Sequence, residues 1–152
     1  MVKKKKRGKV RPLALCVFRR GDHILVTEYF DDLKQAYFYR PLGGRIEFGE
    51  YSQQTVAREL LEEIGEAVTE LRFRGMLENI FTYNGEKGHE IVLLYEGKFE
   101  NPAMYAQDMI EGREGAARFT VRWMPLGFFR RGGAPLYPDG LLELLLESDS
   151  PL

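Results

Sequence analysis

The sequence contains only one cysteine, Cys16, so no disulfide bond can form within the chain. Cys16 lies in the apolar run 13–18, where we expect a buried, unreactive thiol rather than a catalytic one. The sequence also lacks any apolar run close to the roughly 18 residues that a membrane-spanning helix needs, and none follows the basic start as in a secretory signal. These absences predict a soluble, cytoplasmic protein.

Acidic side chains are missing from the first eleven residues, which carry seven lysines and arginines. The other 141 residues hold 15 basic and 23 acidic side chains, so the formal net charge of −1 conceals a basic start and an acidic body. We predict that residues 1–9 form a solvated, disordered tail, with weak attraction to nucleic acid as the alternative. Because 152 residues fit one domain, 10–152 is predicted to be a single domain.

Residue patterns after the tail predict more strands than helices, and therefore a mixed sheet covered by helices. The segment 100–115 has no regular pattern and is predicted to be irregular. The longest helical pattern lies mid-chain and ends at Gly65. Asp139 is a candidate cap for a closing helix. The predicted strands are 10–18, 23–29, 71–83, 90–99 and 118–123, with a short aromatic segment at 37–39, turns at 21–22 and 84–88, and helices at 51–64 and 139–147.

Three glutamates, Glu59, Glu62 and Glu63, fall within an arc of about 100° on the helix predicted at 51–64. Their like charges oppose the helix by roughly 0.2–0.5 kcal/mol per pair, and two of them lie at the negative end of the helix dipole. Unfavourable like-charge pairs and an unfavourable position on the helix dipole, found together in one segment, indicate a functional site. A divalent cation resolves the conflict, and oxygen ligands without nearby His or Cys favour Mg²⁺, Mn²⁺ or Ca²⁺ over zinc.

The loop before this helix supports the same interpretation. Gly43 and Gly44 let the backbone turn sharply and approach a ligand, and a carbonyl there can complete a metal shell. Arg58 can pair with Glu50 or Glu59 and so hold a metal ligand in one rotamer. Each feature alone has a simpler explanation, because an acidic helix face is usually just solvated and a Gly-Gly pair is usually just a turn. Their joint occurrence favours the metal site.

The segment from Gly44 to Gly65 resembles the Nudix box, whose pattern is G-x5-E-x7-R-E-U-x-E-E-x-G-U, with U an aliphatic residue. Glu66 stands at the final aliphatic position, which usually helps to pack the loop after the helix. Eight specified positions match in order with the correct gaps: Gly44, Glu50, Arg58, Glu59, Leu60, Glu62, Glu63 and Gly65. The match is far more specific than a lone glycine motif.

The resemblance implies an α/β protein with the family's Nudix-type α/β/α sandwich and mixed β-sheet, in which 123–126 belongs to a late strand. It also implies metal ligands, Mg²⁺ or Mn²⁺ being the expected cofactor. The ligands would be Glu59, Glu62, Glu63 and the carbonyl of Gly43, oriented by Arg58 and Glu50. Family members often recruit one more acid from outside the box as a ligand or general base. Glu90, Glu111 and Glu114 are candidates, and the sequence does not choose among them.

The expected reaction is metal-dependent hydrolysis of a phosphoanhydride bond in a nucleoside diphosphate linked to another group. Arg40, Arg45 and Glu90 are the predicted substrate contacts. Five aromatic residues, Tyr37, Phe38, Tyr39, Phe81 and Tyr83, offer surface for stacking on a base, although core packing is the simpler explanation, and His89 is a further candidate contact. Two alternatives are a catalytically inactive Nudix-fold binding or regulatory module and an RNA-end-processing hydrolase. The sequence does not determine the oligomeric state, although homodimers are common among the proteins that it resembles.

Overall fold

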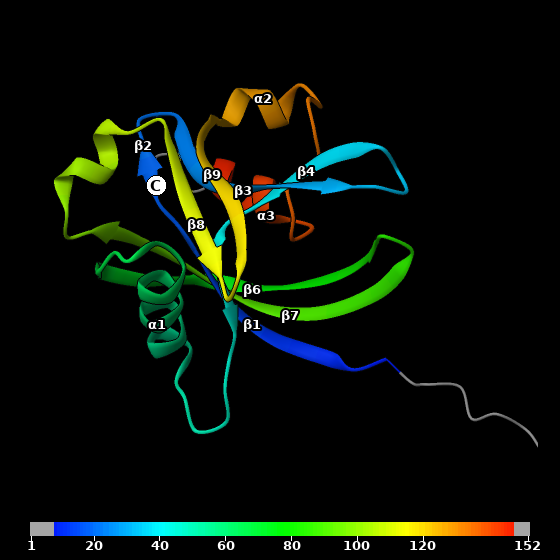
Figure 1. Ribbon diagram of the computed structural model, residues 1–152, viewed down its shortest axis with the longest axis horizontal. Helices are drawn as coiled ribbons and strands as arrows, with labels where there is room; N and C mark the ends of the chain where they lie inside the picture. Colours follow the sequence, from blue (N-terminus) through cyan, green and yellow to red (C-terminus); the bar gives the residue numbers. More distant parts are fainter. Residues whose placement is uncertain (1–7, 148–152) are drawn as a thin grey trace, which may run out of the picture.

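The computed structural model describes residues 8–147; residues 1–7 and 148–152, and with them most of the predicted basic tail, lie outside the described part. Two sheets pack together (Figure 1). The first has the order β5-β1-β7-β6 and is mixed, because β1 runs parallel to β7 while the other neighbours are antiparallel. Its strands are β1 (Val10–Val17), β5 (Leu42–Arg45), β6 (Val68–Tyr83) and β7 (Glu86–Phe99).

The second sheet is antiparallel and follows the order β2-β3-β9-β8, with β4 paired to β3. Its strands are β2 (Arg19–Arg20), β3 (His23–Asp31), β4 (Ala36–Arg40), β8 (Met109–Glu114) and β9 (Ala117–Pro125). The helices are α1 (Ser52–Ile64), the 3₁₀ turn η1 (Pro102–Ala106), α2 (Leu126–Arg130) and α3 (Leu141–Glu147). No helix within residues 8–147 is long and apolar enough to cross a membrane.

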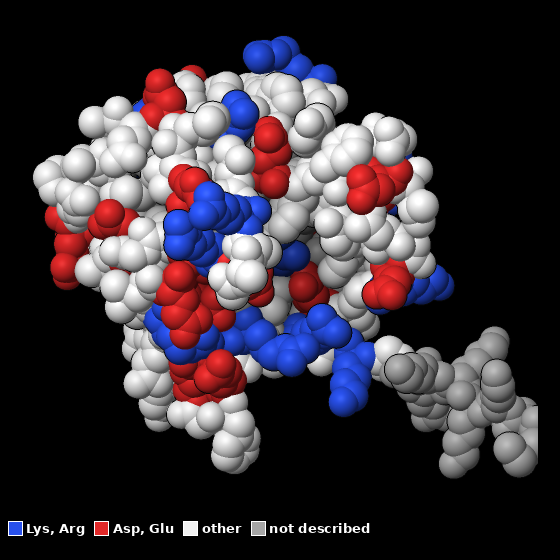
Figure 2. Space-filling view, viewed as in Figure 1, with Lys and Arg blue, Asp and Glu red and all other residues white. Residues whose placement is uncertain are grey.

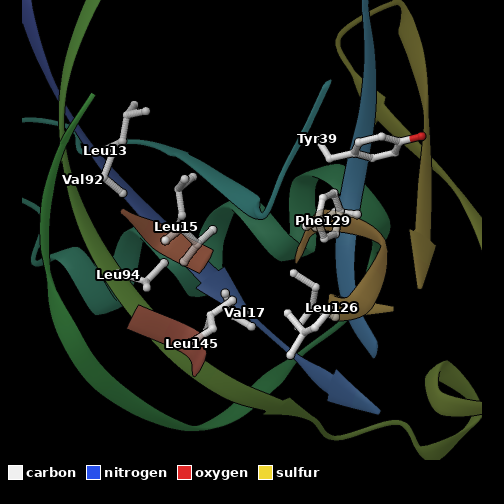
Figure 3. Close-up of a cluster of buried hydrophobic side chains, with 12 residues drawn as sticks. Leu13, Leu15, Val17, Tyr39, Val92, Leu94, Leu126, Phe129 and Leu145 are labelled. Carbon is white, nitrogen blue, oxygen red and sulfur yellow. The ribbon is translucent and has the colours of Figure 1, made fainter. Parts of the chain in front are cut away.

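The core explains why the second half of β1, from Leu13 to Val17, is a continuous apolar run. Alternate side chains of a strand point to opposite faces of its sheet, and both faces of this half of β1 are covered. On one face, Leu15 and Val17 join Leu145 of α3 in a cluster that extends to Phe129 (Figure 3). On the other face, a second cluster contains Ala14, Cys16 and Phe18 with Val56 and Leu60 of α1. The predicted α/β/α sandwich with a mixed sheet is therefore confirmed.

Cys16 is fully buried, as the sequence predicts, and burial raises the pKa of its thiol well above the ordinary value. The segment predicted to be irregular, 100–115, instead contains η1 and β8. The sequence pattern does not indicate β8, because Gly112 lies inside it and glycine is depleted in strands. Here a Cβ on Gly112 would lie 2.1 Å from the ring of Phe119 on β9, so glycine makes room for that ring.

The boundaries of one turn and of helix α3 also differ from those predicted, for local reasons. The turn predicted at 84–88 is only Asn84 and Gly85, whose φ values of 48° and 81° suit a tight two-residue hairpin. Helix α3 begins at Leu141, two residues after the expected cap, because the φ of Gly140 is 88°, which is outside the helical range. Helix α1 starts within one residue of its predicted position and ends at Gly65, whose φ of 71° is left-handed.

Candidate active site

Helix α1 presents two carboxylates, Glu59 and Glu63, to a pocket of about 420 Å³, which we call the acidic cavity. Residues four apart lie on one face of a helix, so the two side chains are neighbours, and both line the cavity. Burial raises the pKa of the Glu63 carboxyl, and the charges of Glu59 and Glu114 raise it further. The acidic cavity therefore brings several carboxyl groups close together where water only partly surrounds them.

Arg58 ties together the loop before α1 and the acids on it. Its guanidinium donates two hydrogen bonds to Glu50, at 2.8 and 3.0 Å, and one to Glu59 at 2.9 Å. It also donates to the carbonyl of Arg45 at 3.1 Å. Hydrogen bonds from Arg58 and then from Thr55 lower the pKa of Glu50 to about 2. This arrangement fixes the Glu59 carboxylate at the edge of the cavity.

Thr55 is a site residue that sequence reasoning missed. It is fully buried, and its hydroxyl donates to Glu50 at 2.6 Å. A threonine in a helix interior is an inferior helix former, which is the only signal the sequence offered. Glu66, which stands in place of the usual aliphatic residue, accepts a hydrogen bond from Asn101 at 3.2 Å, so a polar contact links the loop after α1 to the residue that caps η1.

Glu62 differs from the other two predicted ligands in its exposure. Its side chain is 59% exposed and does not line the acidic cavity, although the Arg58 Nη1 that bonds Glu59 also donates to Glu62, at 3.2 Å. Consistently, no group of three or more acidic, His or Cys side chains within residues 8–147 is arranged to hold a metal ion by itself. The structure thus brings together a pair of carboxylates, Glu59 and Glu63, and the assignment of Glu62 as a ligand stays a prediction.

The two glycines of the loop are required for different reasons. A Cβ on Gly43 would lie 2.1 Å from the backbone oxygen of Ala14, and the φ of Gly43 is 142°. A Cβ on Gly44 would instead lie 2.5 Å from the carboxyl carbon of Glu59. Gly43 therefore permits the pairing of β5 with β1, whereas Gly44 leaves space for the carboxylate of Glu59.

We expect Gly44→Ala and Gly43→Ala to have opposite profiles. The Gly44→Ala methyl displaces the Glu59 carboxylate from Arg58 and should lower turnover about 10-fold with little change in melting temperature. The Gly43→Ala methyl meets backbone in a left-handed conformation and should lower the free energy of unfolding by about 1–3 kcal/mol. Thermal unfolding and steady-state kinetics of both variants measure this. Full activity in Gly44→Ala would contradict the role given to that space.

Of the three candidate acids outside the box, two line the acidic cavity, Glu90 and Glu114. Glu111 does not line it and pairs with Arg118 at 3.2 Å. Glu90 is buried and accepts hydrogen bonds from Arg40 at 3.2 Å and from Asn79 at 3.4 Å. Arg40 and Arg45, predicted from their proximity to the glycines, both line the cavity, but the guanidinium of Arg40 is already paired with Glu90.

A second pocket of about 550 Å³, which we call the aromatic cleft, lies between the β3–β4 and β6–β7 hairpins. Hydrogen bonds tie the two hairpins together near their tips: the Asn84 N–H donates to Asp31 at 3.2 Å, and Lys34 donates to the Thr82 carbonyl at 2.8 Å. Aromatic side chains and His89 line the cleft: Tyr29, Tyr37, Phe38, Phe81, Tyr83 and Tyr137. Tyr39, by contrast, is buried against Phe129 in the core.

The aromatic cleft and the acidic cavity are continuous. Five residues line both of them: Arg11, Tyr29, Arg40, Glu90 and Glu114. Figure 2 shows this face of the molecule hollowed near its centre, with acidic side chains in the hollow and basic side chains along its lower border. The arrangement can therefore bind one elongated ligand, with an anionic part held near Glu59 and Glu63 and an aromatic part held between the hairpins.

The model of the NUDIX domain matches residues 9–138, which is most of the chain. No curated protein matches the sequence significantly.

Similar solved structures include a MutT NUDIX hydrolase from Burkholderia pseudomallei, at 20% identity and TM-score 0.61, covering 93% of this chain and 99% of that one. A NUDIX hydrolase from Nitrosomonas europaea is 18% identical, with TM-score 0.60 and coverages of 92% and 88%. A mutator MutT protein from Bacillus halodurans is 16% identical, with TM-score 0.61 and coverages of 93% and 84%. At these identities the structural likeness supports the fold, and together with the family match it shows that this chain belongs to the Nudix hydrolase family.

Proposed function

We propose that this protein is a pyrophosphohydrolase that uses Mg²⁺, or Mn²⁺, to split a phosphoanhydride bond in a nucleoside diphosphate linked to another group. The observation that carries the proposal is that Glu59 and Glu63, neighbours on one face of α1, both line one end of a continuous cavity. Two acids placed so close together are unfavourable unless a proton or a cation lies between them. Aromatic side chains at the other end of the cavity fit a nucleoside.

The donor set suits magnesium. Mg²⁺ takes one or two carboxylates together with substrate phosphates and water, rather than a cage of protein ligands. Glu59 and Glu63 supply two carboxylates, and the carbonyl of Gly43 is the proposed backbone donor. Zinc is disfavoured because the residues that line the acidic cavity include no His or Cys. A metal ion held by these residues would neutralise phosphate charge and lower the pKa of the attacking water.

The chain's own residues position the reacting groups. The guanidinium of Arg58 is held in place by hydrogen bonds to both carboxylate oxygens of Glu50, and it donates a further hydrogen bond to Glu59. The Glu59 side chain therefore cannot rotate freely. Glu114 is proposed to accept the proton from water, because it lines the cavity, acts electrostatically on Glu63 and has no ion-pair partner within residues 8–147. Glu90 is a weaker candidate for that step, since Arg40 and Asn79 already occupy one of its oxygens.

The test is a screen of the purified full-length protein with Mg²⁺ against nucleoside triphosphates, nucleotide sugars, dinucleoside polyphosphates and capped RNA. Chromatography of the products is the measurement. We expect at least one small molecule to be cleaved at a phosphoanhydride bond, with activity abolished by EDTA and restored by Mg²⁺ or Mn²⁺. Binding without cleavage would support an inactive binding module, and cleavage of RNA alone would support RNA-end processing; either result would overturn the proposal.

A further inference from the structure

Arg11 belongs by position to the basic start of the chain, yet in the structure it lies at the junction of the two pockets. It belongs to β1, in register with Glu90 of β7, and Leu13 two residues later is in register with Val92. Leu13 and Val92 both belong to the core cluster under α3. Because side chains two apart on a strand share a face, Arg11 projects to that same side of the sheet. It lines both the acidic cavity and the aromatic cleft.

Arg11 is also a cation without an ion-pair partner among residues 8–147. The other cation at the junction of the two cavities, Arg40, forms an ion pair with Glu90 at 3.2 Å. Glu90 and Glu114 both line that junction, so a diphosphate that crosses it meets two carboxylates and needs a compensating positive charge.

We propose that Arg11 is a substrate-binding residue whose guanidinium contacts the phosphate lying between the acidic cavity and the aromatic cleft. The inference rests on the proposed function, since it assigns a residue to the phosphate chain of that substrate. A planar guanidinium can donate two parallel hydrogen bonds to one phosphate, which a lysine cannot do. Lys9, the basic residue that precedes Arg11 in the described part of the chain, lines the aromatic cleft but not the acidic cavity, so the effect of Arg11 should be separable from it.

The experiment compares Arg11→Ala and Arg11→Lys with wild type, with Arg130→Ala as the matched control. Arg130 is an exposed arginine at the end of α2 and lines neither cavity. The probes are the four ribonucleoside α,β-methylene diphosphates, which resist hydrolysis, and the four parent nucleosides. Calorimetric titration in the presence of Mg²⁺ measures affinity, and steady-state kinetics on the cleaved substrate gives kcat and KM separately.

We expect Arg11→Ala to weaken binding of the diphosphate analogue about 10-fold and to raise KM by a similar factor, with nucleoside affinity unchanged. Arg11→Lys should fall between, and Arg130→Ala should equal wild type. Equal affinity of Arg11→Ala and wild type for the diphosphate analogue would overturn the inference while leaving the proposed hydrolysis intact. A parallel loss of nucleoside affinity would also overturn it, because phosphate contact would then not be the cause. Absence of both binding and cleavage in wild type would instead overturn the proposed function.

Discussion

Glu63→Gln is expected to lower turnover by about 10²–10³-fold, the range seen when one charged or hydrogen-bonding group that stabilises a transition state is removed. The amide preserves the shape of the side chain but cannot bind a cation as a carboxylate does. It also removes the like-charge contact with Glu59, so the metal-free variant should unfold at a temperature equal to or above that of wild type. Kinetics and thermal unfolding, each with and without Mg²⁺, measure both effects.

A matched control for this change is Glu100→Gln, which makes the same substitution at an exposed position after β7 that lines neither cavity. It should leave both kinetics and the stabilisation by Mg²⁺ as in wild type. The melting temperature of the wild-type protein should rise on adding Mg²⁺, because a ligand that binds only the folded state stabilises it. The Glu63→Gln protein should lose most of that rise. Near-normal activity in a folded Glu63→Gln protein would refute the assignment.

Arg58→Ala is expected to lower turnover about 100-fold, at the upper end of the effects of groups that orient metal ligands. It frees the Glu59 carboxylate and removes the two hydrogen bonds that Glu50 accepts from Arg58. Arg58→Lys should recover little of this activity, since an ammonium group cannot reproduce the two-pronged contact with Glu50. Kinetics of the two variants beside wild type give the measurement, and substantial rescue by lysine would show that charge alone suffices.

The pH dependence of stability offers an independent check on Arg58. Its hydrogen bonds lower the pKa of Glu50 to about 2, whereas an unfolded glutamate titrates near about 4.3. A lowered folded-state pKa means that the contribution is fully present above the unfolded value and is lost as the pH falls toward 2. The difference in melting temperature between wild type and Arg58→Ala should therefore be constant near neutral pH and shrink between about pH 4 and 2. A difference that stays constant to pH 2 would contradict the pairing.

Much of the fold and the centre of the site follow from local sequence. Helix α1 was predicted within one residue at its start because its apolar residues recur at helical spacing and Gly65 ends it. The neighbouring placement of Glu59 and Glu63 follows from the same geometry, since residues four apart meet on any helix. The box also contains the partners of Arg58, so their pairing required only a short loop to fold back.

Other features depended on segments far apart in the chain. Strand β8 forms because β9 offers a ladder and Gly112 makes room for Phe119, and the sequence of 109–114 alone does not indicate a strand. The choice of Glu114 over Glu111 follows from where that ladder ends beside α1. The aromatic residues were divided between cleft and core by the packing of the two sheets, which placed Tyr39 in the core and Phe81 in the cleft.

The sequence by itself thus determined the helix, the glycine turn and the crowding of acidic side chains, because each depends on the regular spacing of neighbouring residues along one backbone segment. Only the tertiary structure decided that Glu114 rather than Glu111 lines the acidic cavity and that Arg11 lines the junction of the two pockets. Those outcomes depend on which strands become neighbours, and β1 and β7 are joined through long-range hydrogen bonds that no local pattern encodes.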